Sequence, residues 1–268
     1  MSIIIKTQAQ IDLMRISCKL AAEVLDYIEP YVKPGITTLE LDKLCHDYIV
    51  NVQDAYPSPL NYQPNPKGPA YPNSICTSVN AEICHGIPND KPLKNGDIVN
   101  LDITVYKNGV HGDTSRTYLV GDKVTPQAKR LVQITYECMW LGIKQVKPGN
   151  FLGDIGHAIQ THAEKNAYSV VQEFCGHGIG EGFHEDPQVL HYGKAKTGPQ
   201  LQAGMIFTIE PMINQGKRTV RFSSNGWTAL TKDRSLSAQF EHTILVTPDG
   251  YEVLTISPNM PAIPDFMK

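Results

Sequence analysis

Apolar residues recur at the three-to-four-residue spacing of an α-helix in four stretches of the chain. In the first, Thr7 and Gln10 have the sequence signature of a capping box, and apolar positions follow from Ile11 to Ile28. The pair Pro34-Gly35 lies beyond the end of this helix. The other stretches predict a helix that begins at Thr37 or Thr38 and includes Ile49, one from Pro126 to about Gln145, and one from Leu152 to Asn166.

Several other stretches have the composition of β-strands. Residues 74–88 (SICTSVNAEICHGIP) are rich in β-type residues, and strands are predicted at Ser169–Phe174, Met205–Ile213 and Ser237–Thr247. Residues 54–73 are different, because they contain six prolines with Tyr56, Tyr62 and Tyr71 between them. We expect an irregular loop there, and a loop of this length in a compact domain is usually functional or disordered. Helices alternating with strands predict an α/β (α+β) fold.

Residues 98–120 predict a β-hairpin. Two β-type runs flank Asn108-Gly109, the dipeptide best suited to a two-residue turn with positive φ at both positions. In this register Asp102 lies opposite Ser115 and Thr104 lies opposite Asp113. Because side chains alternate along a strand, Asp102 and Asp113 then share one face of the hairpin. The opposite face is apolar and has the character of a core; it carries Val99, Leu101, Ile103 and Val105.

Composition excludes several classes of protein. The chain of 268 residues is 41% hydrophobic and 19% charged, with a net charge of −3. It has no basic tract, so we expect no nucleic-acid binding, and no apolar run near the ~20 residues of a membrane span, so we expect no membrane insertion. The six cysteines do not have the paired spacing of a metal-binding motif. The apolar run at the N-terminus is too short for a secretory signal. A cytoplasmic location with reduced thiols is therefore predicted.

A diffuse internal repeat relates the two parts of the chain. Val32-Lys33-Pro34-Gly35 recurs as residues 146–149, and Cys84-His85-Gly86-Ile87 is echoed around His177. Residues 93–102, which end in Asp102, are echoed by residues 201–210, which end in Glu210; the strand that begins at Asp113 is echoed by the one that begins at Glu241. We therefore expect one catalytic domain over residues 1–268 made of two duplicated halves, approximately 8–120 and 121–250.

The repeat places four acids and one histidine in a single candidate cluster: Asp102, Asp113, His177, Glu210 and Glu241. An oxygen-rich site with one imidazole suits Mn²⁺, Fe²⁺, Co²⁺ or Zn²⁺. Four carboxylates carry more charge than one divalent ion balances, which favours two ions that share bridging carboxylates. A solvated acidic face is the plainer interpretation of these acids, but charges within apolar β runs are costly when nothing balances them.

The glycines around His177 allow a rival interpretation. Residues 176–182 read GHGIGEG, which could be a nucleotide-binding loop. Such a loop opens an amphipathic helix, whereas Phe183-His184-Glu185-Asp186-Pro187 follows here. We therefore prefer a loop in which glycines let the backbone approach a site closely.

Long stretches of the chain resemble the bacterial type I methionine aminopeptidases. The motifs are HGIP, NGDIVNLDITVYKNGVHGDTSRTYLVG, CGHGIGEGFHEDP, FTIEPM and GWTALTKDRSLSAQFEHT, spread over nearly the whole length. The resemblance implies a pita-bread fold, in which two pseudo-symmetric halves surround a dinuclear metal site. It implies that Asp102 holds one ion, that His177 and Glu210 hold the other, and that Asp113 and Glu241 bridge both.

The resemblance also implies an activity, namely metal-dependent release of an N-terminal methionine from peptides and nascent proteins when the second residue is small. Glu210 would carry the proton to the leaving amine, His184 would contact the scissile carbonyl, and His85 would contact the amide beyond it. The side-chain pocket would be formed by Tyr71, Cys76, Phe183 and Trp227. Residues 54–73 are longer and richer in proline than the family pattern, so no role is carried over to Tyr56 or Tyr62. We expect a monomer that meets the ribosome transiently, although the sequence itself leaves both properties open.

Two alternatives stay open from the sequence. Proline-specific aminopeptidases share this fold and its five metal ligands, although those chains usually carry a large additional N-terminal domain. A metal-free peptide-binding relative of the same fold is the second alternative, and filled ligand positions argue against it.

Overall fold

The computed structural model describes residues 2–267. Its longer helices are α1 (Gln8–Ile28), α2 (Thr38–Asp47), α3 (Pro126–Ile143) and α4 (Leu152–Lys165), which confirms the four predicted helices. The capping box of α1 is present, with the Thr7 side chain accepting from the Gln10 backbone. Shorter helical turns follow α1 at Glu29–Tyr31, follow α2 at Tyr48–Val52, and lie near the C-terminus at Asp265–Met267.

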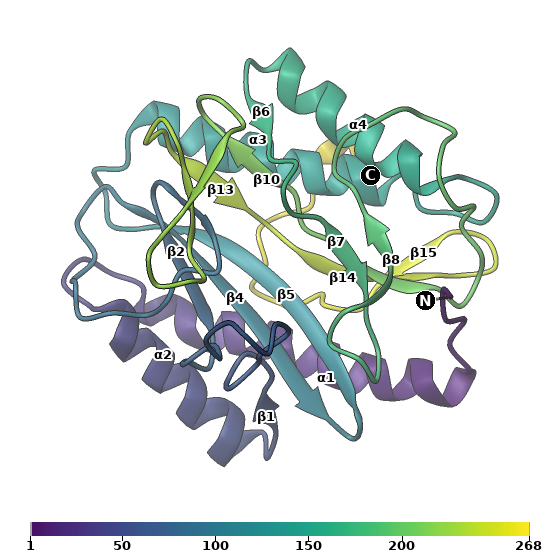
Figure 1. Ribbon diagram of the computed structural model, residues 1–268, viewed down its shortest axis with the longest axis horizontal. Coiled ribbons are helices and arrows are strands. Elements are labelled where there is room, and N and C mark those ends of the chain that lie inside the picture. The colour runs from purple at the N-terminus through teal and green to yellow at the C-terminus, as the bar shows by residue number, and fades with distance from the viewer. Residues whose placement is uncertain (1, 268) are drawn as a thin grey trace.

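The strands form several small antiparallel sheets between the two helix pairs (Figure 1). In the first part of the chain they are β1 (Tyr56–Pro57), β2 (Cys76–Val79), β3 (Glu82–Cys84), β4 (Ile98–Lys107) and β5 (Val110–Leu119). The second part contributes β6 (Ser169–Val170), β7 (Gly176–Gly178), β8 (Glu185–Val189), β9 (Ile206–Ile209), β10 (Met212–Asn214), β11 (Val220–Phe222), β12 (Ala229–Thr231), β13 (Ser237–Gln239), β14 (His242–Val246) and β15 (Tyr251–Val253).

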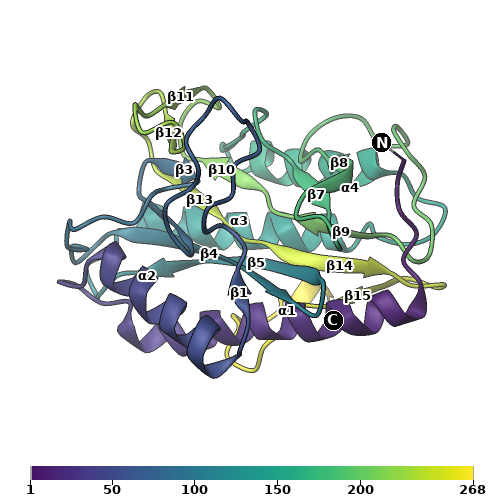
Figure 2. The same ribbon diagram turned by 60° about the horizontal axis from the view of Figure 1, so that its bottom comes forward.

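The predicted hairpin is confirmed in its register. Strands β4 and β5 pair Asp102 with Ser115, Thr104 with Asp113, and Lys107 with Val110. Asn108 and Gly109 both have positive φ in the connecting turn. The apolar face of β4 is buried against α1 and α2, which lie beneath this sheet (Figure 2). The other face, with both aspartates, points toward the second half of the chain.

Two strands predicted as continuous are interrupted. Met205–Ile213 forms β9 and β10, and Ser237–Thr247 forms β13 and β14. The pairing of Ile209 with His242 and of Met212 with Gln239 keeps one register across both interruptions. Glu210 and Glu241 therefore lie opposite each other where regular pairing stops.

The prediction of a strand from Ser169 to Phe174 is wrong beyond Val170. After Val171 bonds to Met212, the chain leaves the sheet, and Phe174 turns toward the central cavity. The Pro-rich segment is irregular as expected, except that β1 pairs with β4. The GHGIGEG segment begins as strand β7 and leads through a turn to strand β8, so the nucleotide-loop interpretation is wrong.

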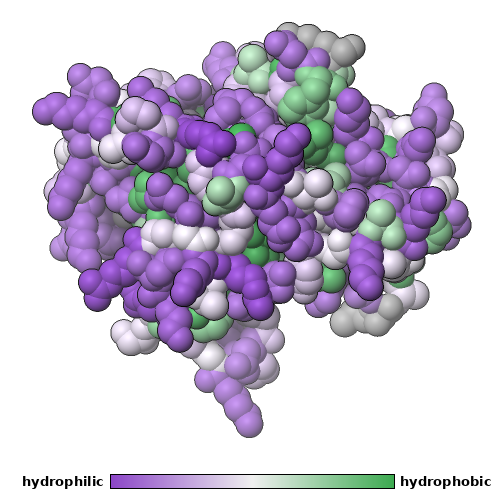
Figure 3. Space-filling view, turned by 90° about the horizontal axis from the view of Figure 1, so that it is seen from above, coloured by the Kyte–Doolittle hydropathy of each residue, from purple (hydrophilic) through white to green (hydrophobic). Residues whose placement is uncertain are grey.

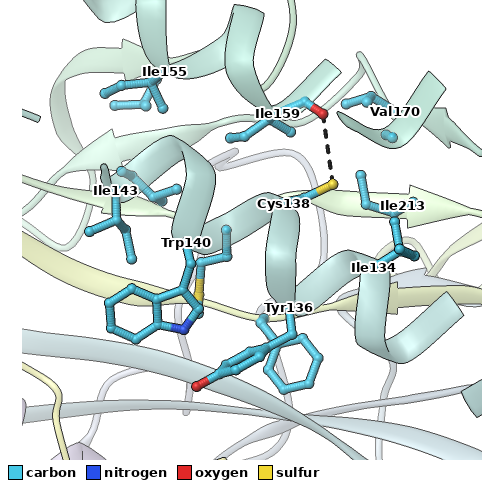
Figure 4. Packing of buried hydrophobic residues seen from close by; sticks show 14 of the residues in the cluster. Ile134, Tyr136, Cys138, Trp140, Ile143, Ile155, Ile159, Val170 and Ile213 are labelled. Atoms are coloured by element: carbon cyan, nitrogen blue, oxygen red, sulfur yellow. Dashed lines mark hydrogen bonds between the residues drawn. The ribbon is translucent and has the colours of Figure 1, made fainter. Parts of the chain in front are cut away.

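Each helix pair has its own apolar core. The core under α3 and α4 is the larger and includes Tyr136, Trp140 and Ile159, with the Cys138 thiol 3.7 Å from the Ile159 carbonyl oxygen (Figure 4). The face of the molecule seen from above is mainly hydrophilic, with hydrophobic residues scattered over it (Figure 3). Among residues 2–267, no helix combines the length and apolarity needed to cross a bilayer.

Candidate metal centre

The site lies where the hairpin meets the interrupted strands of the second half. Ser115 of β5 and Glu241 exchange two backbone hydrogen bonds, of 3.1 and 3.4 Å, and Thr243 donates to the Asp113 carbonyl at 2.7 Å. These bonds join β5 to the segment that contains β13, Glu241 and β14. In Figures 1 and 2, β5 and β14 run side by side. A cavity of about 500 Å³ opens above this junction.

The five predicted metal ligands all line this cavity. Asp113, His177 and Glu241 each present an atom within 4.8 Å of the others. The Nε2 atom of His177 is 3.7 Å from Asp113 Oδ2 and also 3.7 Å from Glu210 Oε1. The structure therefore places Asp113, His177, Glu210 and Glu241 close together, and Asp102 lines the same cavity.

His177 is held in one ring orientation. Its Nδ1 lies 3.0 Å from the Gly178 carbonyl oxygen, so the hydrogen is on Nδ1 and the lone pair is on Nε2. Its backbone N–H donates to Thr208 Oγ1 at 3.0 Å, and that hydroxyl donates to Glu210 Oε1 at 2.8 Å. A lone pair that faces two carboxylates is repulsive unless a cation lies between them.

Burial disfavours the charged form of every group in the cluster. Burial is the main cause that raises the pKa of Asp102 to about 7 and of Glu210 to about 8. The pKa values of Asp113 and Glu241 are also raised, first by burial and then by the neighbouring carboxylates. Burial lowers the pKa of His177 to about 4, so the imidazole is neutral at pH 7.

The donor set fits a divalent cation. Asp102 Oδ1 and Glu241 Oε1 are buried with no hydrogen-bond partner among the described residues. Buried carboxylate oxygens without donors are costly, and a cation would satisfy them. Two other oxygens of the cluster accept hydrogen bonds from threonines, since Thr104 donates to Asp113 Oδ1 and Thr208 to Glu210 Oε1, each at 2.8 Å.

The two predicted substrate histidines flank the cluster. His85 has φ +55°, an unusual conformation for a residue with a side chain, and its ring packs edge-on against Phe174 at 5.4 Å. The ring of His184 lies 4.2 Å from that of His177 and is open to solvent in the cavity. Its Nδ1 is 2.8 Å from the Tyr62 hydroxyl.

The four predicted pocket residues form an apolar wall of the same cavity. Tyr71 is buried, its hydroxyl donates to the carbonyl oxygens of Ile75 and Gly86, and its ring meets Trp227 edge-on at 5.2 Å. Cys76 pairs with Asp102 in the β2–β4 ladder, and burial raises the pKa of its thiol well above the ordinary value. Phe183 packs on Tyr62 at 4.9 Å.

The cavity is also lined by residues that were not predicted from the sequence, among them Tyr62, Phe174, Met212 and Gln239. Gln239 donates to Glu210 Oε2 at 3.2 Å. Met212 and Gln239 stand two positions from Glu210 and Glu241, and residues two apart share a strand face, so this spacing could have found them. Tyr62 lies in the Pro-rich loop, which has no helical or strand periodicity from which the direction of a side chain could be predicted.

Known proteins with similar sequences and structures include metallopeptidases, which agrees with the metal-binding character of the cluster. Residues 12–248 match the model of metallopeptidase family M24. A methionine aminopeptidase of Escherichia coli K12 is 56% identical over 257 residues, which cover 96% of this chain and 95% of the relative. The crystal structure of methionine aminopeptidase from Rickettsia prowazekii is 55% identical, with a TM-score of 0.91, and covers 95% of this chain and 100% of that one.

A prolidase from Pyrococcus furiosus has a TM-score of 0.73 at 20% identity and covers 96% of this chain but 66% of that one, so it shares the fold alone. The pita-bread fold expected from the sequence is confirmed by these neighbours. This chain therefore belongs to metallopeptidase family M24 and, within it, to the methionine aminopeptidases.

Proposed function

We propose that the protein hydrolyses the bond after an N-terminal methionine in peptides and nascent proteins when the second residue is small. The observation that carries this proposal is the cavity itself, which has a buried acidic cluster at one end and an apolar, sulfur-containing wall beside it. A polarisable wall with aromatic rings suits a thioether side chain.

Two divalent ions fit the acids best. Asp102 would hold one ion, His177 and Glu210 the other, and Asp113 and Glu241 would serve both. Mn²⁺, Fe²⁺, Co²⁺ and Zn²⁺ are all compatible with this ligand set. When bound, the ions supply an activated water and a positive charge for the substrate carbonyl.

The protein's own groups complete the chemistry. Glu210 takes the proton of the attacking water and gives it to the leaving amine, since its carboxylate lies in the cluster and is fixed there by Thr208 and Gln239. His184 donates to the scissile carbonyl oxygen, where negative charge develops. His85 contacts the amide on the far side of the scissile bond.

The setting of this activity belongs to the same proposal. One domain of two halves, 8–120 and 121–250, is supported by the acids that each half contributes to the cavity. A monomer in the cytoplasm that meets ribosomes transiently would have access to nascent chains, and free thiols at all six cysteines suit a reducing compartment.

One assay tests the proposal. We expect release of methionine from Met-Ala-Ser, much slower release from Met-Lys-Ser, and no cleavage of Ala-Pro-Ala. Activity is lost after chelation and returns on addition of Mn²⁺, Fe²⁺, Co²⁺ or Zn²⁺ singly. Equal kcat/KM for Met-Ala-Ser and Met-Lys-Ser, or full activity without metal, would contradict the proposal.

A further inference from the structure

The Pro-rich loop is closed at its base by a short neck made of Asn61, Tyr62 and Tyr71. The Asn61 N–H donates to the Tyr71 carbonyl and the Tyr71 N–H to the Tyr62 carbonyl, each at 2.8 Å. Residues 63–70 form the loop beyond the neck. The neck therefore fixes two tyrosines at the edge of the cavity.

The two tyrosines use their hydroxyl groups differently. Tyr71 donates to backbone carbonyls and so anchors the loop to the fold. The Tyr62 hydroxyl instead reaches across to the second half, where it lies 2.8 Å from His184 Nδ1. The ring of Tyr62 is stacked on that of His184 at 5.2 Å and 27°. Tyr62 therefore contacts a histidine that already has a place in the proposed reaction.

The contact has a consequence for the hydrogen on His184. In a neutral imidazole one ring nitrogen donates and the other accepts, and the group bonded to one nitrogen decides the role of the other. Among the described residues, the one hydrogen-bond partner of the Tyr62 hydroxyl is His184 Nδ1. A phenol that donates to Nδ1 leaves the hydrogen of His184 on Nε2.

We propose that Tyr62 is a positioning residue that holds His184 with its hydrogen on Nε2 and its ring in one orientation, ready to donate to the scissile carbonyl oxygen. The inference rests on the proposed function for the role of His184, but the hydrogen-bond geometry does not depend on it. Tyr62 acts through His184 and performs no chemistry itself.

The loop is held independently of the Tyr62 hydroxyl. On one side, Ser58 Oγ lies 2.8 Å from His111 Nδ1, and His111 stacks on Phe183 at 5.3 Å. On the other, Trp227 Nε1 donates to the Pro69 carbonyl at 3.1 Å. Removal of the hydroxyl alone should therefore leave the Tyr62 ring in place, so Tyr62→Phe isolates the hydrogen bond from the packing.

The experiment combines NMR and kinetics on the whole protein. The ¹⁵N shifts of the His184 ring nitrogens, identified by their loss in His184→Gln, report which nitrogen carries hydrogen in the metal-free and Zn²⁺-loaded protein. We expect hydrogen on Nε2 and a hydrogen-bonded Nδ1 in the wild type. In Tyr62→Phe the Nδ1 resonance should shift toward that of a solvated imidazole, and kcat for Met-Ala-Ser should fall roughly 5- to 10-fold, the effect of one neutral hydrogen bond.

Tyr56→Phe is the matched control, because it removes a tyrosine hydroxyl from the same loop. That hydroxyl donates to the Leu60 carbonyl and stays outside the cavity. We expect unchanged His184 shifts and unchanged kcat in this variant. In Tyr62→Phe, KM and metal content should also remain near those of the wild type.

Three results would overturn the inference. Hydrogen on Nδ1 in the wild type would reverse the direction of the bond, and unchanged shifts in Tyr62→Phe would remove the coupling. A change in KM alone would make Tyr62 a pocket wall and nothing more. If the wild type releases no methionine the proposed function fails instead, while the NMR result still decides the state of His184.

Discussion

Asp113 shows at the level of one residue why the cluster calls for a cation. Its side chain is 5% exposed, and Thr104 donates to one of its oxygens. The other oxygen faces His177 Nε2, which carries a lone pair and not a hydrogen. A buried carboxylate whose donors are all neutral is expensive, so an added positive charge would stabilise Asp113 more than an exposed acid.

The first prediction concerns this carboxylate. Asp113→Asn removes a charge that would serve both ions and places an amide against a neutral imidazole. We expect metal affinity to fall by more than the ~10–100-fold that loss of an outer hydrogen-bonding partner costs, and methionine release to fall with it. Metal affinity is measured by isothermal titration calorimetry. Asp90→Asn, at an exposed acid, is the control, and near-normal metal content in Asp113→Asn would refute the assignment.

Residues of the site differed in how far the sequence could predict them. The acids could be found because each lies at a repeated position in a strand, where period and register fix the direction of a side chain. Tyr62 could not be found in this way, since its place depends on the loop neck and on a partner 122 positions away. Contacts of that range leave no periodic trace in the sequence.

At the level of elements, helices and the hairpin were predictable because their signals are local. Caps, apolar spacing and Asn108-Gly109 act within a few residues. Of the two interruptions, the one at Glu210 has a local signal, because Pro211 has no N–H to donate to the ladder, whereas nothing local breaks the strand at Glu241. Pairing is lost there as Glu241 turns its backbone to Ser115 of the other half, a contact that forms only in the assembled fold.

Helix α1 and strand β5 approach each other more closely than a side chain allows. A Cβ on Gly112 would lie 2.3 Å from the backbone of Ser17 and of Cys18 in α1. Gly112→Ala should therefore push the helix away from the strand and reduce the free energy of unfolding by about 1–3 kcal/mol, the usual cost of overpacking.

Metal affinity should decrease in the same variant, because Asp113 is the next residue on β5. Urea unfolding of the metal-free protein measures the change in the free energy of unfolding. The control is Gly250→Ala, whose Cβ would have nothing closer than 3.9 Å, and we expect a change below ~0.5 kcal/mol there. If Gly112→Ala and Gly250→Ala changed the free energy of unfolding equally, the close approach of α1 and β5 would not contribute to stability.

Over the whole molecule, the cavity lies between the two layers of helices. Helices α1 and α2 cover one core and α3 and α4 cover another, and the acids of the cavity come from both the early and the late part of the chain. Folding brings the four carboxylates together at a cost in electrostatic repulsion and desolvation. Metal binding would offset that cost, so the stability of the whole protein should depend jointly on metal and pH.

The sign of this dependence follows from the pKa shifts. In the metal-free fold the pKa of Asp102 rises from 3.8 to about 7 and that of Glu210 from 4.5 to about 8. A raised pKa in the folded state means that the stability from these groups is present below their unfolded values and is lost as pH rises through about 7 to 8. Metal binds the ionised carboxylates, so its stabilisation grows over the same range.

The last prediction is that the difference in Tm between Mn²⁺-saturated and metal-free protein widens as pH rises from below about 7 to above about 8. Differential scanning calorimetry at several pH values, with metal removed by a resin whose uptake is checked at each pH, measures it. Glu210→Gln lacks one of the shifted acids and should show a smaller pH dependence in the metal-free form. A Tm difference that stays constant or narrows as pH rises would mean that the acids do not exchange protons for metal, and the cluster would lose its interpretation as a metal centre.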